Sequence, residues 1–383
     1  RSLSVHIVDY LVGLGPRWSG RESTRKAADY LAEAFGGLDL AVQRQDFPFV
    51  GWDVDELPSL EILEPEQRQA TVALMEYSGS TPPDGLVGEM YEAGMAYIVP
   101  GFLEWPRYAI VTTDGTVGAY LIVHIGLGGW DAPPIPLHNP EPLYPYPMAI
   151  MQERDHRSIQ DWLRAGRRVR VRFRSRGHPV SPMSGHNVVA TLPGKTAQTI
   201  VFTAHLDTAY GTPGANNIAG GVQAMYDLAR RLKATGPHRL TYRFLACDCC
   251  EWNFLGSRFF VLEEKAHGRL GRIVANINID TVASGDSLFL LASTPDARRD
   301  AEAVVEKLHL CQLFRQVEYL PALAGSDHYS FIQAGITAFE ILFWPCTVYK
   351  LPQDDVSQVD ASLIVRSVEI AHELAMTFEQ HIS

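Results

Sequence analysis

The run Thr199-Ile-Val-Phe-Thr-Ala204 decides the fold class, together with two similar runs that follow it. These are Leu240-Thr-Tyr-Arg-Phe-Leu-Ala246 and Ile273-Val-Ala-Asn-Ile-Asn-Ile279, and helical spacing of apolar residues predicts helices at 219–234 and 255–266 between the runs. Short apolar runs that alternate with helices are typical of parallel strands buried on both faces. The sequence therefore predicts an α/β fold with a mainly parallel sheet sandwiched by helices.

The rest of the chain predicts further elements and an insertion. Helical spacing from about residue 4 to 36 predicts two helices, and alternation from Ala41 to Phe49 predicts a strand. Between about 56 and 180, short predicted strands are broken by Gly and Pro. The predicted organisation is an α/β domain built from residues 1–55 and 181–383, with an inserted β-rich module at 56–180.

Composition excludes two classes of partner. The chain has 383 residues, of which 46% are hydrophobic and 20% charged, as in a soluble globular protein. Its formal net charge of −11 leaves no broad basic surface, so we expect no nucleic-acid partner. No apolar run approaches the roughly 20 residues that cross a bilayer, so we expect no membrane partner. The sequence does not predict an oligomeric state.

The amino terminus and the cysteines bear on the compartment. Arg1-Ser-Leu-Ser-Val-His6 lacks the apolar region of a signal peptide. Five cysteines, three of them within Cys247–Cys250, do not form an evenly spaced disulfide framework. We therefore expect a cytoplasmic protein, with a removed leader as the alternative because the chain does not begin with Met.

Reactive side chains follow the predicted strands. His205, Cys250, Glu251 and Asp280 each come shortly after one of the apolar runs. Parallel α/β sheets bind ligands at the carboxyl ends of their strands. The pattern therefore predicts a functional site at this edge of the sheet.

The segments around these residues resemble the motifs of the M28 zinc peptidases. Thr203-Ala-His-Leu-Asp207, followed by Pro213-Gly-Ala-Asn-Asn-Ile-Ala-Gly-Gly221, resembles the family's AHxD strand end and its PGADDNASG-like turn. Gly325-Ser-Asp-His-Tyr-Ser-Phe331 resembles the SDHxxF segment. The resemblance covers about residues 1–50 and 185–383, and by its position the inserted module resembles a protease-associated domain.

The resemblance implies that part of a metal site is retained. His205, Asp280 and Glu251 stand at positions equivalent to zinc ligands, and Asp207 would orient the imidazole of His205. Asp327 belongs to the retained SDHxxF segment.

Three other positions depart from the family pattern. Asn216 stands where the resemblance implies the metal-bridging Asp, Cys250 where it implies the general-base Glu, and Lys350 where it implies a His ligand. Two zinc ions would be poorly compensated by the remaining carboxylates, because one carboxylate is lost and a cation is added. We therefore expect either no metal or a single zinc, with the Lys350 ammonium forming a buried ion pair with Glu251 in place of the second zinc.

The leading functional hypothesis is a repurposed M28-like enzyme acting on a peptide-like or amino-acid-derived amide without the two-zinc centre. Cys250 would be its nucleophile, with Lys350 and the histidines His205 and His328 favouring the thiolate and Asp327 supplying an acid. Such an enzyme would be a hydrolase or an acyl transferase. Two alternatives stay open, a zinc-dependent aminopeptidase or cyclase with one metal, and a catalytically inactive pseudopeptidase that binds a peptide or a metabolite.

Overall fold

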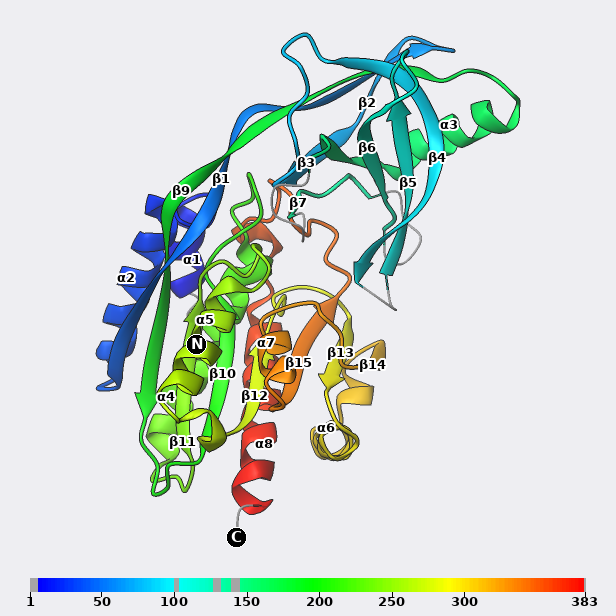
Figure 1. Cartoon of the computed structure of the whole chain (residues 1–383). Helices are drawn as coiled ribbons and strands as arrows, with labels where there is room; N and C mark the ends of the chain where they lie inside the picture. Colours follow the sequence, from blue (N-terminus) through cyan, green and yellow to red (C-terminus); the bar gives the residue numbers. More distant parts are fainter. Residues whose placement is uncertain (1–5, 100–102, 127–131, 139–144, 382–383) are drawn as a thin grey trace. The chain divides into compact units, whose positions relative to one another are not determined.

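The structure, a computed structural model, divides into two compact units. One unit contains the chain up to Pro48 and from Ser184 onward, and the other contains Phe49–Met183. Two long strands, β1 (Ala41–Glu64) and β9 (Arg170–Leu192), run from one unit into the other (Figure 1). The predicted domain boundaries, after residues 55 and 180, lie inside these two strands. The structure describes residues 6–99, 103–126, 132–138 and 145–381.

The sheet of the first unit is mixed, and its middle strands are parallel. β10 pairs in parallel with β11 on one side and with β12 on the other, and β12 pairs in parallel with β15. β13 and β14 are also parallel, whereas β9 with β11 and β13 with β15 are antiparallel. The strands are β10 (Thr199–His205), β11 (Thr241–Cys247), β12 (Ile273–Ile279), β13 (Ser287–Ala292), β14 (Gln316–Leu320) and β15 (Thr337–Trp344).

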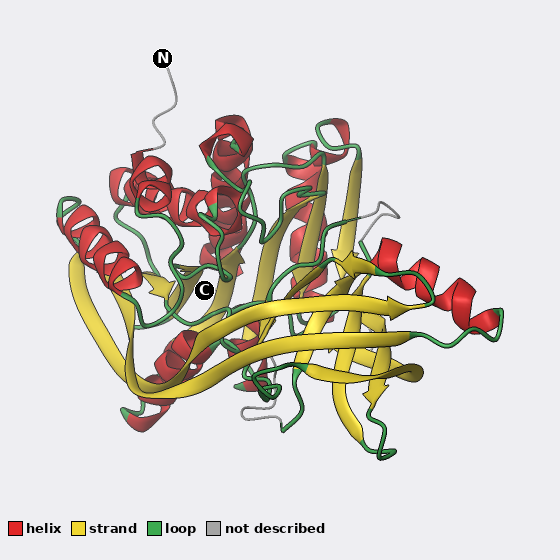
Figure 2. Cartoon of the chain, turned by 90° about the horizontal axis from the view of Figure 1, so that it is seen from above, coloured by secondary structure: helices red, strands yellow, loops and turns green. Residues whose placement is uncertain are grey.

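Helices cover both faces of this sheet (Figure 2). Ile200 and Phe202 of β10 join a core with α1, α2, α4, α6 and α8, and Val201 joins a second core with α5 and α7. Neighbouring strand residues enter different cores because successive side chains point to opposite faces. The predicted α/β class is confirmed. The helices are α1 (His6–Gly13), α2 (Glu22–Gly36), α4 (Gly221–Thr235), α5 (Leu255–Ala266), α6 (Pro295–Lys307), α7 (His328–Gln333) and α8 (Ala361–His381), with a π-helical turn at Ala215–Gly220 and 3-10 turns at Leu270–Arg272, Leu310–Gln312 and Val356–Gln358.

The second unit is a mainly antiparallel sheet with one helix. β4 lies between β9 and β5, followed by β6, β8 and β3. Its core contains Leu121, Val123, Val171 and Phe173. The elements are β2 (Arg68–Ala70), β3 (Val72–Glu76), β4 (Leu86–Val99), β5 (Leu103–Val111), β6 (Val117–His124), β7 (Leu137–His138), β8 (Met148–Gln152) and α3 (Glu153–Arg164).

Two features of the structure differ from the predicted module of short strands, namely two long strands and a helix. β1 and β9 have 24 and 23 residues, because the alternation of exposed and buried side chains continues through them. Helix α3 was not predicted, although Ile159, Trp162 and Leu163 have helical spacing and pack on the core of this unit; its other residues are mostly charged or polar. Residues 100–102, 127–131 and 139–144 of the predicted module lie outside the described residues.

In the described part of the chain, no helix is long and apolar enough to cross a membrane. Residues 1–5, on which the prediction about the amino terminus partly rests, lie outside this description.

Candidate functional site at the carboxyl edge of the sheet

The side chains predicted to form a site lie at one edge of the sheet. His205 is the last residue of β10, and Asp280 directly follows β12. Cys250 and Glu251 follow the end of β11, whose last residue Cys247 is paired in register with His205. Because these strands are parallel, their carboxyl ends meet at the same edge.

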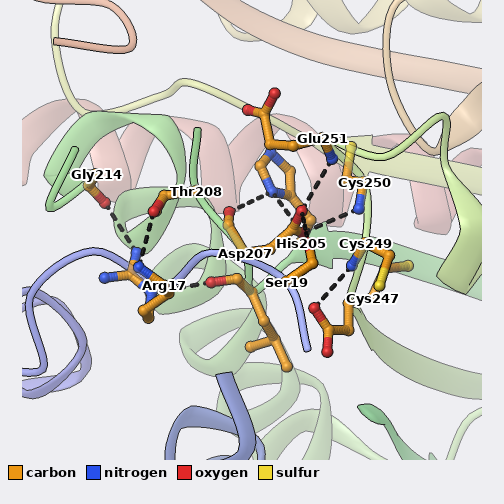
Figure 3. Close-up of polar contacts among 12 residues, drawn as sticks. Arg17, Ser19, His205, Asp207, Thr208, Gly214, Cys247, Cys249, Cys250 and Glu251 are labelled. Carbon is orange, nitrogen blue, oxygen red and sulfur yellow. Dashed lines mark hydrogen bonds and ion pairs between the residues drawn. The ribbon is translucent and has the colours of Figure 1, made fainter. Parts of the chain in front are cut away.

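Asp207 connects these segments through its buried carboxylate. Its Oδ1 accepts the backbone N–H of Cys250 at 2.9 Å, and its Oδ2 accepts the backbone N–H of Glu251 at 2.9 Å and the hydroxyl of Ser19 at 2.8 Å (Figure 3). The ring Nδ1 of His205 lies 3.4 Å from Oδ1. This ring nitrogen also lies 2.9 Å from the backbone carbonyl oxygen of Asp207, so Asp207 contacts the imidazole and holds the backbone of the loop after β11.

His205 carries a proton in this arrangement. Burial alone would lower the pKa of His205, but the hydrogen bond to Asp207 and the negative charge of Asp280 raise this pKa to about 10. The Nε2 atom of His205 lies 3.9 Å from Oδ2 of Asp280.

Lys350 and Glu251 form the predicted ion pair. Nζ of Lys350 lies 2.5 Å from Oε2 of Glu251, and the two side chains are only 11% and 10% exposed. Burial alone would lower the pKa of Lys350, but the Glu251 carboxylate raises it above its ordinary value. The lysine is therefore charged at neutral pH.

The structure corrects the position predicted for the bridging residue. Asn216 points away from the ligand positions, since its Nδ2 donates to Ser284 Oγ at 2.8 Å and its Oδ1 accepts the N–H of Ala283 at 2.6 Å. Asn217 instead faces the site, and its Nδ2 donates to Oδ1 of Asp280 at 3.0 Å. The Oδ1 of Asn217 is buried and has no hydrogen-bond partner among the described residues.

Two adjacent asparagines explain why sequence reasoning chose the wrong one. The family turn has two acidic residues at this point, so the pattern alone fits either position. The backbone separates them: Asn217 has φ −109° and ψ 80°, outside the helical region, inside the π-helical turn that precedes α4. That local break turns the second asparagine toward Asp280.

Arg17 holds the turn before the asparagines, and sequence reasoning missed this role. Its buried guanidinium donates to the carbonyl oxygens of Leu206 at 2.9 Å, Pro213 at 2.7 Å and Gly214 at 3.2 Å. Burial lowers the pKa of Arg17 to about 10, which still leaves it charged at neutral pH. Arg17 thus joins the residue after His205 to the start of the asparagine turn (Figure 3).

Asp354 holds the same turn from the other side. Its Oδ1 accepts the N–H of Asn216 at 2.8 Å, and its Oδ2 accepts the N–H of Asn217 at 3.0 Å. No sequence pattern predicted this role, because the contacts go to the backbone of the turn. Arg17 and Asp354 together place Asn217 against the site.

The electrostatics of Cys250 oppose the predicted thiolate. The thiol is buried, and its Sγ lies 3.9 Å from Oγ of Ser326. Burial raises the pKa of Cys250 well above its ordinary value, and the negative charges of Asp327 and Asp207 raise it further. Burial, the largest cause of this rise, and the neighbouring carboxylates do not support the expectation that Lys350 favours the thiolate.

The other two predicted catalytic residues are buried beside the site. Burial raises the pKa of Asp327 to about 6, although the charge of His205 opposes this rise. His328 points elsewhere: its Nε2 lies 2.9 Å from the carbonyl oxygen of Leu323, and its Nδ1 lies 3.5 Å from Oε1 of Glu340. Cys250 interacts with Asp327, but His328 contacts Leu323 and Glu340 instead, so the histidine does not join the predicted grouping of a Cys, a His and an acid.

The donor atoms at this edge do not fit a two-zinc centre. Among the described residues, no three His, Cys, Asp or Glu side chains are grouped so that they could hold a metal ion. His205 and Asp280 remain, but Asn217 presents its amide N–H to Asp280 and Lys350 occupies Glu251. Structural and catalytic zinc sites use at least three protein ligands from His, Cys, Asp and Glu.

Comparison with known proteins agrees with the fold and the motifs. Residues 187–375 match the model of peptidase family M28. The aminopeptidase YwaD of Bacillus subtilis (strain 168) is 24% identical over 384 residues, which cover 90% of this chain and 77% of that protein.

Two solved structures share the fold over nearly the whole chain. The aminopeptidase from Aneurinibacillus sp. strain AM-1 has a TM-score of 0.70 at 20% identity, covering 97% of this chain and 92% of its own. The peptidase M28 precursor from Shewanella amazonensis SB2B has a TM-score of 0.76 at 16% identity, covering 99% and 93%. The family match over residues 187–375 supports an M28 peptidase-like protein, and the solved structures show that its fold extends over nearly the whole chain.

Proposed function

We propose that this chain is a metal-independent M28 peptidase-like protein that binds a peptide or an amino-acid-derived ligand without hydrolysing it. The hypothesis of a pseudopeptidase is thereby preferred over the Cys250 enzyme and over the single-zinc enzyme. The choice rests on the charges and hydrogen bonds at the carboxyl edge of the sheet.

The ion pair between Lys350 and Glu251 carries the proposal. The Glu251 carboxylate is already compensated by a buried ammonium at 2.5 Å, so a metal ion at the same carboxylate would face the repulsion of Lys350. The second metal position of the family is thus taken by a positive charge that belongs to the chain itself. This arrangement favours a site in which the chain's own cations compensate the carboxylates without zinc.

The remaining charges favour binding over nucleophilic catalysis. The burial and the neighbouring carboxylates that raise the pKa of Cys250 keep its thiol protonated and therefore weakly nucleophilic. The protonated imidazole of His205 cannot act as a general base, because its pKa of about 10 leaves no free ring nitrogen to accept a proton at neutral pH.

The net charge of the site suits the amino end of a peptide. The carboxylates at the site (Asp207, Glu251, Asp280 and Asp327) outnumber its cations (His205 and Lys350). The free amide oxygen of the neighbouring asparagine adds an acceptor. An ammonium group supplies both the positive charge and the donors that these acceptors lack. Relatives named as aminopeptidases support a ligand of this kind.

Calorimetry with a matched pair of dipeptides tests the proposal. We expect a dipeptide with a free amino terminus to bind at least about tenfold more tightly than its N-acetylated form, since one charge-assisted hydrogen bond contributes about 1.5–3 kcal/mol. Added EDTA should leave this affinity unchanged, and no free amino acid should accumulate. Hydrolysis abolished by EDTA would favour the single-zinc enzyme, and hydrolysis abolished by Cys250→Ala would favour the cysteine enzyme.

A further inference from the structure

A pocket lies at the opposite edge of the same sheet from the candidate site. Its volume is about 590 Å³, and it is lined where β10, β11 and β12 begin, by Thr199, Thr241 and Ile273. The carboxyl ends of these strands form the candidate site described above. The pocket at their amino ends is therefore separate from that site and owes nothing to the family's metal positions.

The pocket forms where the sheet face changes from apolar to polar. Leu245 of β11 packs in the core beneath α5, but Arg243, two residues earlier on the same face, lines the pocket. Its partner in register on β9 is Thr191, which also lines the pocket. The last turns of α5, which ends at Ala266, face this polar part, since Glu263 and Glu264 also line the pocket.

A buried carboxylate fixes two arginines at the pocket. Glu264, at 1% exposure, pairs with Nη1 of Arg243 at 2.8 Å and accepts Nε of Arg269 at 3.1 Å and Nη2 of Arg269 at 2.8 Å. The Arg243 guanidinium also lies 4.8 Å above the ring of Phe260. Each guanidinium has five N–H donors, and these contacts use only some of them, so donors remain for a ligand.

A third arginine adds a charge that no carboxylate neutralises. Arg272 lines the pocket and is exposed, and it forms no ion pair within the described part of the chain. Gln45 also lines the pocket, and its buried Oε1 has no hydrogen-bond partner among the described residues.

The lining is positive although the chain is acidic. Arg243, Arg269 and Arg272 contribute +3, and Glu263 and Glu264 contribute −2, so the sum is +1 with His neutral. The whole chain carries −11. The positive charge of the pocket lining is thus opposite in sign to the net charge of the chain.

We propose that this pocket binds a small, multiply charged oxyanion, such as a phosphate-type or polycarboxylate group. Guanidinium groups bind such oxygens through paired N–H donors, and two of the three arginines are held in place before the ligand arrives. The free amide oxygen of Gln45 accepts a hydroxyl or a protonated group of the same ligand.

Titration calorimetry of the whole protein with pyrophosphate, and separately with citrate, tests this site. We expect saturable binding of one probe, which identifies the phosphate-type or the carboxylate class. Arg272→Gln should weaken that binding at least about tenfold, because it removes charge-assisted hydrogen bonds. Arg272 is exposed, so the variant should fold as the wild type does, which a thermal melt verifies.

Lys265→Gln is the matched control, since it removes a positive charge from the last turn of α5, next to Glu264 of the pocket, at an exposed residue that does not line the pocket. It should bind the probe as the wild type does. Equal weakening of probe binding by Arg272→Gln and Lys265→Gln would overturn the proposal, because the effect would then come from the net charge of the protein and not from the pocket. Absence of saturable binding of both probes would overturn it as well.

Discussion

Nζ of Lys350 lies 2.5 Å from Oε2 of Glu251, where both side chains are nearly nine-tenths buried. Each group would be costly at this depth without the other, because a buried ion loses its hydration. Each member of this pair therefore depends on the other more than the members of a surface salt bridge do. It also places a permanent positive charge beside a carboxylate that the family uses for zinc.

Removal of one partner should destabilise the protein strongly. Lys350→Met leaves the Glu251 carboxylate buried and unpaired, so we expect a loss of about 3–5 kcal/mol in the free energy of unfolding. The double variant Lys350→Met with Glu251→Gln should recover most of this loss, because no charge is left unpaired. Chemical denaturation of the three proteins measures the difference. A single variant as stable as the wild type would show that the pair is not formed in solution.

Cys250 should react slowly with alkylating reagents at neutral pH. Its thiol is buried and its pKa is raised, whereas Cys311 is exposed. We expect iodoacetamide to modify Cys311 at least about tenfold faster than Cys250, since the thiolate is the reacting species. Peptide mass spectrometry of a time course measures both rates. Preferential labelling of Cys250 would restore the nucleophile hypothesis.

Arg17 should be required for the geometry of the asparagine turn. Arg17→Met removes donors to Leu206, Pro213 and Gly214; because the Gly214 carbonyl keeps the N–H groups of Ile218 and Ala219, two carbonyl groups lose their donor, and we expect a loss of at least about 2 kcal/mol. Arg17→Lys keeps the charge but not the fork of donors, and it should recover only part of the stability. Hydrogen exchange of the backbone amide of Asn217 should become faster in both variants. Unchanged exchange at this amide would contradict the positioning role.

The Arg243–Glu264–Arg269 cluster should make stability depend on acidic pH. Burial alone would raise the pKa of Glu264, but Arg269 and Arg243 lower it below its ordinary value of 4.5. A lowered pKa means that the carboxylate stabilises the fold fully above its unfolded pKa and that this contribution is lost as the pH falls through the folded pKa. The thermal midpoint of unfolding of the wild type should therefore decrease as the pH is lowered below about 4.5. The midpoint of Glu264→Gln should decrease less over the same pH range. The same decrease of the thermal midpoint at acidic pH in the wild type and in Glu264→Gln would refute this assignment.

Particular residues show how far the sequence predicts this molecule. The strands β10, β11 and β12 could be predicted because strands buried on both faces are apolar throughout. The positions of His205, Glu251 and Asp280 at the carboxyl edge follow from that topology. Helix α3 was missed because most of its residues are charged or polar.

The details of the site depend on contacts that residue patterns do not encode. The choice between Asn216 and Asn217 is made by one non-helical backbone conformation and by Asp354, whose carboxylate binds backbone N–H groups. The charge state of Cys250 depends on carboxylates brought from distant parts of the chain, including Asp207 and Asp327. Such contacts appear only in three dimensions.

The zinc content of two variants, compared with the wild type, tests the central claim most directly. Each protein is equilibrated with zinc, dialysed and measured by elemental analysis. Asn217→Asp with Cys250→Glu and Lys350→His restores the family residues at the positions that face the site, and Asn216→Asp in the same background is the matched control. The account predicts almost no zinc in the wild type, stoichiometric zinc in the Asn217 variant and less in the Asn216 variant. One or more equivalents of zinc in the wild type would contradict it.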